Sequence, residues 1–229
     1  MEIPLYLSMT ASEFAHCENL PKHTAWMACH FSPYSSGLTN IPADLPEKSL
    51  LILNDRTPIQ KNDPSQIKQE LNEIICSLNC CGVLLDLQRK DCCEAGELIQ
   101  QLLTLPCPVC ISDIYAKDFD CPVFLPPVPL TVTPDEYLMP WFGREIWLDM
   151  ATECAVVSAS KSGCQREPHV LTEDLPFFEE QLFLHYRTEV AEDTVRFYLQ
   201  RTKDDVRKLL SYCASFGVST GVGLWQELK

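Results

Sequence analysis

The chain has 229 residues, of which 46% are hydrophobic, and its formal net charge is -14. That hydrophobic fraction indicates a packed globular protein and excludes a disordered one. The negative charge argues against nucleic acid and anionic membranes as main partners, because clustered Lys and Arg side chains bind both. No apolar run approaches the roughly 20 residues that a membrane-spanning helix needs.

Two features bear on the cellular compartment. The first residues, Met1-Glu2-Ile3-Pro4, have neither a basic segment nor a long apolar one, so no secretory signal is seen and we expect a cytoplasmic protein. The 13 cysteines are then expected to be reduced thiols that pack as small core residues. Cys107 and Cys110 have the spacing of a metal or redox pair, but no second pair completes a zinc site. We therefore expect no metal and no cofactor.

Short apolar segments typical of strands recur along the chain, and most are followed by a helical pattern or a short linker. The clearest helix opens with Asp63-Pro64, after which Ile67, Leu71 and Ile74 follow at helical spacing. Strands are expected at residues 3–8, 24–31, 49–55, 81–88, 108–113, 121–125, 145–149 and 221–227. Helices are expected at residues 11–17, 63–78, 97–105 and 202–213, the last ending at Gly217.

This order of elements predicts one domain, 1–229, with a compact (β/α)8 TIM-type barrel fold of the α/β class. An open doubly wound sheet is the competing fold, but no Gly-rich turn follows the first strand. A β-hairpin is expected as an insertion at about 181–199, before the last helix and strand. Residues 158–173 are polar and irregular, and we expect an exposed loop there.

The fourth predicted strand, Cys81 to Gln88, carries the clearest functional pattern. It is almost wholly apolar until Asp86 and Gln88, which are two residues apart and therefore point to the same side of the sheet. The carboxyl ends of barrel strands are where such folds hold their chemistry. The structural alternatives are that Asp86 caps a turn and that Gln88 is a solvated loop residue.

Other polar side chains fall at or just after predicted strand ends, where a barrel would gather them around one mouth. Asp113, Asp149 and Glu227 are candidates for acid–base chemistry alongside Asp86. Asp55 also falls at a strand end, and His30 and His185 could join this group, although a lone histidine is more often structural.

The fourth strand resembles the signature of the family-18 glycoside hydrolases, the chitinase-like barrels, which reads Asp-Gly-x-Asp-x-Asp-x-Glu. Gly82 and Asp86 match that signature. Cys81, Leu84 and Gln88 replace its first Asp, its second Asp and its catalytic Glu. The third strand also lacks the Ser-x-Gly-Gly of that family, and the sixth lacks its Met-x-Tyr-Asp.

The end of the chain is similar to the same family in its order of elements. A β-rich insertion follows the seventh strand in those barrels, and then an acidic pair, a helix, a Gly and an eighth strand that ends in Trp. Here the hairpin is followed by Asp204-Asp205, a helix, Gly221 and Trp225. The resemblance implies that Trp225 lies at the floor of a sugar cleft, although it could also be a plain core residue.

The resemblance implies a substrate-assisted hydrolysis in which a glutamic acid protonates the leaving oxygen and the neighbouring Asp orients the N-acetyl group. A glutamine cannot deliver that proton, and general acid catalysis is worth about 10²–10⁴-fold in rate. We therefore expect a non-catalytic protein that binds an oligosaccharide or another glycan. Asp86, Gln88, Trp225 and Tyr115, which follows the fifth strand, are the expected ligand-binding residues.

Two alternatives remain at this point. The protein could be an active glycoside hydrolase in which another carboxylate at the barrel mouth replaces the missing acid, and clustered carboxylates with raised pKa values would favour this reading. It could instead be a scaffold that acts through its hairpin or its loop. The sequence predicts neither the ligand nor the oligomeric state.

Overall fold

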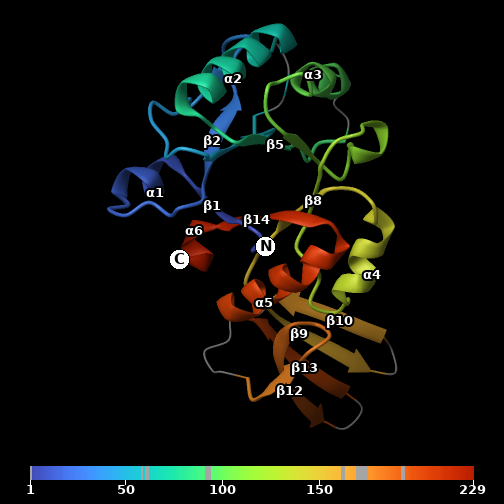
Figure 1. The fold of residues 1–229 in the computed structure, drawn as a ribbon. Coiled ribbons are helices and arrows are strands. Elements are labelled where there is room, and N and C mark those ends of the chain that lie inside the picture. The colour runs from blue at the N-terminus through green and yellow to red at the C-terminus, as the bar shows by residue number, and fades with distance from the viewer. Residues whose placement is uncertain are drawn as a thin grey trace.

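Eight parallel strands close into a barrel in the computed structural model, which describes residues 2–57, 59, 62–90, 94–160, 163–168, 175–191 and 194–229 (Figure 1). Neighbouring strands pair in parallel, and β1 pairs with both β14 and β2, which closes the ring. The predicted (β/α)8 barrel is confirmed. Its strands are β1 (Leu5–Met9), β2 (Thr24–Phe31), β4 (Leu50–Asn54), β5 (Gly82–Asp86), β6 (Val109–Ser112), β7 (Val123–Leu125), β8 (Ile146–Asp149) and β14 (Val218–Leu224).

Helices and short linkers cover the outside of the barrel. The link from β2 to β4 is described throughout and holds only the two-residue strand β3 (Leu38–Thr39). None of the helices in the described ranges is long and apolar enough to cross a bilayer. The helical segments are α1 (Ala11–His16), α2 (Pro64–Leu78), α3 (Glu94–Leu102), η1 (Ala116–Asp118), α4 (Pro134–Leu138), η2 (Met139–Trp141), α5 (Lys203–Cys213), η3 (Ala214–Phe216) and α6 (Trp225–Leu228).

The apolar side chains of the barrel strands form two cores. One fills the interior of the barrel and includes Leu84 and Trp147, and the other lies between the strands and the helices and includes Leu85. Leu84 and Leu85 are 1% and 0% exposed, which explains why β5 is apolar without alternation. Because side chains alternate along a strand, Asp86 points to the same side as Leu84 and lies above the filled interior at the barrel mouth.

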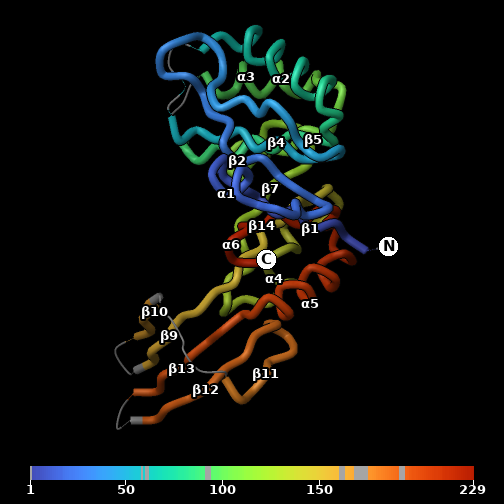
Figure 2. The backbone as a smooth tube through the Cα atoms, turned by 90° about the vertical axis from the view of Figure 1, so that its left-hand side faces the viewer, coloured from blue at the N-terminus to red at the C-terminus, as the bar shows by residue number. Residues whose placement is uncertain are grey.

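A second, antiparallel sheet is inserted between β8 and α5, and its strand order is β10-β9-β13-β12-β11. Both views place this insertion sheet at the end of the molecule opposite α2 and α3 (Figures 1 and 2). The hairpin predicted at about 181–199 is confirmed as two of its strands, β12 and β13. The strands are β9 (Glu153–Ser160), β10 (Gly163–Pro168), β11 (Phe177–Glu179), β12 (Leu184–Ala191) and β13 (Thr194–Arg201).

The expectation of an irregular loop at 158–173 is wrong for the part of it that is described. β9 pairs with β10 on one side and with β13 on the other, so ladder hydrogen bonds hold this polar segment in strand conformation. Residues 163–167 of β10 are exposed, and therefore their side chains gave no hydrophobic pattern. Residues 161, 162 and 169–173 of the expected loop lie outside the described residues.

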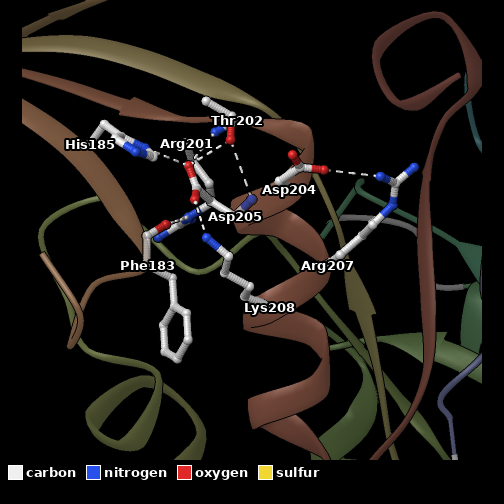
Figure 3. A network of polar contacts seen from close by, with 8 residues as sticks. All are labelled: Phe183, His185, Arg201, Thr202, Asp204, Asp205, Arg207 and Lys208. Atoms are coloured by element: carbon white, nitrogen blue, oxygen red, sulfur yellow. Dashed lines mark hydrogen bonds and ion pairs between the residues drawn. The ribbon is translucent and has the colours of Figure 1, made fainter. Parts of the chain in front are cut away.

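Two buried charged residues join the insertion sheet to the barrel (Figure 3). Arg201, which is 1% exposed, donates hydrogen bonds to the carbonyl oxygens of Val128 at 2.5 Å and Leu182 at 2.9 Å. Asp205 at the start of α5 contacts His185 Nδ1 of β12 at 2.9 Å and accepts from the Thr202 hydroxyl at 2.7 Å. Burial alone raises the pKa of Asp205, but the hydrogen bonds from Thr202 and His185 outweigh burial and lower it.

The last barrel strand lies earlier in the sequence than predicted. Gly217 adopts a left-handed conformation with φ 92° after η3, which turns the chain directly into β14 at Val218. The strand then ends at Leu224 rather than at residue 227, because α6 begins at Trp225. Trp225 and Glu227 therefore lie on a short helix that follows β14, and the prediction that they belong to the strand is wrong.

Candidate functional site

A cleft of about 440 Å³ opens at the carboxyl ends of β1, β2, β4 and β5. Its lining includes His30, Asn54, Asp55, Asp86 and Gln88. These residues come from the ends of different strands, so the closure of the barrel gathers them from distant parts of the sequence. The volume lies within the range of roughly 300–1,000 Å³ that is typical of small-molecule sites.

Asp86 and Gln88 are in direct contact at this mouth. The Gln88 side-chain amide donates a hydrogen bond to Asp86 Oδ1 at 2.6 Å. Burial and the charge of Asp55 raise the pKa of Asp86, and the Gln88 amide opposes them. Gln88 itself is exposed, so its amide remains accessible from the cleft.

Asp55 holds the turn that carries Gln88. Its side chain is buried, and Oδ2 accepts hydrogen bonds from the backbone N–H groups of Gln88 at 3.0 Å and Arg89 at 2.8 Å. Ser112 braces the same segment from β6, since its hydroxyl accepts from the N–H of Leu87 at 2.8 Å. Both residues support the turn that carries Gln88, whereas the sequence pattern indicates Asp55 only as a polar residue at a strand end.

Among the described carboxyl groups at the mouth, Asp149 has the most strongly shifted pKa. Burial raises its pKa to about 7, with further contributions from the negative charges of Asp86 and Glu227. Glu227 Oε2 is shielded from solvent and has no hydrogen-bond partner among the described residues. Asp86 of β5 and Glu227 of α6 therefore both influence Asp149 of β8.

Tyr137 connects the fourth candidate acid, Asp113, to this group. Burial and the charges of Asp113 and Asp149 raise the pKa of Tyr137 to about 12, and its hydroxyl donates to the Pro126 carbonyl at 2.9 Å. The sequence pattern of strand ends does not indicate Tyr137, because this residue lies on the short helix α4. The Thr133 side chain that caps α4 is the signal that could have placed it.

The other predicted residues do not contact the Asp86–Gln88 pair through any hydrogen bond of the described residues, and their contacts are as follows. Tyr115 donates its hydroxyl to the Arg89 carbonyl, so it braces the turn after β5. His30 lines the cleft and contacts Asn54 Oδ1 through Nδ1 at 2.9 Å. Trp225 follows β14 directly and is half-buried, and Lys229 Nζ lies 5.9 Å from the ring centroid. His185 belongs to the junction with the insertion sheet.

The part of the chain that the structure describes contains neither a metal-binding cluster nor a disulfide. No group of three or more His, Cys, Asp or Glu side chains there is arranged to hold a metal ion. The described cysteines are free thiols. Burial raises the pKa values of Cys29, Cys80 and Cys213 to about 12, which keeps these three thiols protonated and unreactive at neutral pH.

No protein-family model matches this sequence, and no curated protein matches it either. Solved structures, however, match the fold of this chain. A chitinase-like agglutinin of Robinia pseudoacacia aligns with a TM-score of 0.58 at 10% identity, over 98% of this chain and 95% of its own. A family-18 N-acetylglucosaminidase of Paenibacillus barengoltzii aligns with a TM-score of 0.56 at 8% identity, over 99% and 98%.

The fold is that of a chitinase-like barrel. A third match is a Cycas revoluta family-18 chitinase variant that includes a Glu-to-Gln substitution, in complex with (GlcNAc)4, with a TM-score of 0.55 at 10% identity over 97% and 94%. Counted along the barrel in chain order, β5 is the fourth strand and β8 the seventh. Gln88 therefore follows the strand at which the sequence resemblance placed it, and the insertion sheet follows the seventh.

Proposed function

We propose that the protein binds a saccharide at the mouth of its barrel and does not cleave it through residue 88. The observation that carries this proposal is the 2.6 Å hydrogen bond from the Gln88 amide to Asp86. It fixes an amide beside a carboxylate at the end of the fourth barrel strand. An amide donates and accepts hydrogen bonds, but it has no proton to give to a leaving group near neutral pH.

The surroundings of this pair suit a sugar. The cleft offers Asp86, Gln88 and Asn54 as hydrogen-bonding groups. Trp225, which follows the eighth strand, does not line this cleft, and it would serve as a stacking surface only for a saccharide that extends beyond it. One structural neighbour is described as a chitinase-like agglutinin, and another is a variant with a Glu-to-Gln substitution that holds (GlcNAc)4. Both support a saccharide as the ligand class to be tested first.

A second candidate function is hydrolysis with Asp149 as the general acid. The specific observation in its favour is the pKa of about 7, which keeps a large fraction of Asp149 protonated near neutral pH. Asp86 would then remain the residue that orients the substrate. This activity requires a saccharide that reaches from Asp86 to Asp149, whereas simple binding does not.

One experiment separates these functions. Chito-oligosaccharides and a panel of other glycans are added to the protein, and both the melting temperature and the release of products are measured. Binding alone predicts a ligand-dependent rise in melting temperature with no product. Trp225→Ala should abolish the rise, and Trp141→Ala, which truncates another half-buried tryptophan on η2, should preserve it.

Product release that survives Gln88→Ala and is lost in Asp149→Asn would establish the hydrolase instead. A protein that neither shifts nor releases product with any glycan would refute both candidates.

A further inference from the structure

Arg56 brings an unused positive charge to the cleft at the barrel mouth. The residue lines the cleft and is exposed. Its backbone N–H donates to Asn54 Oδ1 at 3.2 Å, whereas its guanidinium makes no hydrogen bond or ion pair within the described residues. A guanidinium holds five N–H donors in a fixed planar fork. Arg56 therefore offers a ligand several donors together with a full charge.

The two carboxylates that line the same cleft are already hydrogen-bonded. Asp55 is buried, and its Oδ2 atom accepts from the backbone N–H groups of Gln88 and Arg89. Asp86 Oδ1 accepts from the side-chain amide of Gln88 at 2.6 Å. Donors within the chain therefore engage both acids, and the guanidinium is the charged group of the lining that is left for a ligand.

The pairing of β4 with β5 places Arg56 next to the Asp86–Gln88 pair. The two strands are parallel, and Asn54 is the register partner of Asp86. Arg56 lies two residues beyond Asn54, just as Gln88 lies two residues beyond Asp86, so both follow the ends of neighbouring strands. A ligand at these strand ends meets the Arg56 guanidinium and the exposed Gln88 amide together. Both groups donate hydrogen bonds, which suits an acidic group on the ligand.

His30 supplies an acceptor in the same cleft, which suits the hydroxyl groups of a sugar. Asn54 Nδ2 donates to the Met27 carbonyl at 3.3 Å, and Asn54 Oδ1 lies 2.9 Å from His30 Nδ1. Because an amide oxygen only accepts, His30 Nδ1 carries the proton in this contact. The other ring nitrogen, Nε2, has no partner among the described residues, and in a neutral imidazole it accepts a hydrogen bond.

We propose that the saccharide bound in this cleft carries a carboxylate, as hexuronic acid residues do, and that Arg56 selects it. This inference rests on the proposed function, since it names the ligand class of the same cleft. A carboxylate is planar and accepts two parallel N–H bonds from a guanidinium, so the pair also fixes the orientation of the acidic ring. The neutral ring next to it then lies against Asp86 and Gln88.

The test is calorimetric titration of the protein with two tetrasaccharides. One is a hyaluronan tetrasaccharide, in which glucuronate alternates with N-acetylglucosamine, and the other is the neutral N-acetylglucosamine tetramer. We expect the hyaluronan tetrasaccharide to bind about tenfold or more tightly at low ionic strength, because hydrogen bonds between charged groups are the stronger ones. Salt at about 0.5 M should reduce this advantage, since Arg56 is exposed to solvent.

Variants assign the preference to its residue. Arg56→Gln removes the charge and the fork, and it should bring the two affinities to within about twofold of each other. Arg56→Lys keeps the charge without the paired donors and should retain part of the preference. Arg196→Gln, which changes an exposed arginine on β13, is the matched control and should preserve the preference in full. Thermal unfolding of each variant checks that it is folded.

The outcomes separate this inference from the proposed function. If the neutral tetramer binds as tightly as the hyaluronan tetrasaccharide, or if Arg56→Gln keeps the full preference, Arg56 does not select an acidic saccharide, while saccharide binding still stands. If neither tetrasaccharide nor any other glycan binds, the proposed function fails and this inference fails with it.

Discussion

The side-chain amide of Gln88 lies 2.6 Å from Asp86 Oδ1 at the carboxyl end of the fourth barrel strand. This contact accounts for two properties of the mouth together. It gives Asp86 a hydrogen-bond donor, and it places an amide where the resemblance to chitinase-like barrels predicts a carboxylic acid.

Gln88→Glu should create hydrolytic activity if position 88 lies where an acid can reach the glycosidic oxygen. Restoring a general acid is worth up to about 10²–10⁴-fold in rate, so product release from chito-oligosaccharides should rise above background. Reducing-end assays over a range of pH would measure it. Gln100→Glu on the exposed face of α3 is the control and should stay at background. A Gln88→Glu protein that binds chito-oligosaccharides but remains inactive would contradict this placement of residue 88.

Asp149 should make the protein less stable as the pH rises. Its pKa is about 7 in the folded chain and 3.8 as the unperturbed value, so the folded state binds more protons between these two values. Stability is therefore lost as the pH increases through this window, by an amount on the order of 4 kcal/mol. Urea unfolding should show Asp149→Asn to be more stable than the wild type at about pH 8, and the difference should shrink at about pH 5. An equal difference at both pH values would show that Asp149 does not titrate in this window.

Arg201 should be essential to the junction between the barrel and the insertion sheet. Arg201→Met leaves the carbonyl oxygens of Val128 and Leu182, which are buried and partly buried, without this donor. We expect the free energy of unfolding to fall by at least about 2 kcal/mol. Arg196→Met removes an exposed arginine from the same strand and should change stability by less than about 0.5 kcal/mol. Similar losses in both variants would mean that the buried contacts of Arg201 contribute little.

Asp55 should affect both stability and ligand binding. Asp55→Ala removes the acceptor of the Gln88 and Arg89 N–H groups, which should cost roughly 1–3 kcal/mol and weaken glycan binding by loosening the turn. Asp55→Asn keeps one side-chain oxygen and should therefore lose less stability and less glycan binding than Asp55→Ala. Denaturant unfolding and glycan titration of the two variants, with exposed Asp44→Ala as the control, measure these effects. Unchanged binding in Asp55→Ala would show that Gln88 does not depend on this support.

The barrel was predictable because its strands are short, apolar and buried on both faces. β5 illustrates this, since the run from Gly82 to Leu85 needs no alternation when the interior lies on one side and the helices on the other. Only part of the insertion sheet could be predicted from the sequence. β12 and β13 have a hairpin pattern, whereas β9 is held by pairing with β13, which is distant in sequence, and the exposed edge strand β10 pairs with β9.

The positions of the candidate residues at the ends of barrel strands were predictable, but the contacts among them were not. The rule that polar residues gather at the carboxyl ends of barrel strands found Asp86, Gln88 and Asp149. Nothing in the local sequence indicated that Tyr137 on α4 lies near Asp113 and Asp149, or that Asp55 accepts two backbone N–H groups. Those relationships depend on the closure of the barrel, which brings together residues that are far apart in the chain.

The most direct test of the central claim is a crystal structure of the protein with a chito-oligosaccharide. The account predicts an intact saccharide at the carboxyl ends of the barrel strands, with sugar hydroxyl or nitrogen atoms within hydrogen-bond distance of Asp86 and Gln88. A saccharide bound elsewhere, with an empty mouth, or one cleaved at the mouth in the crystal would contradict it.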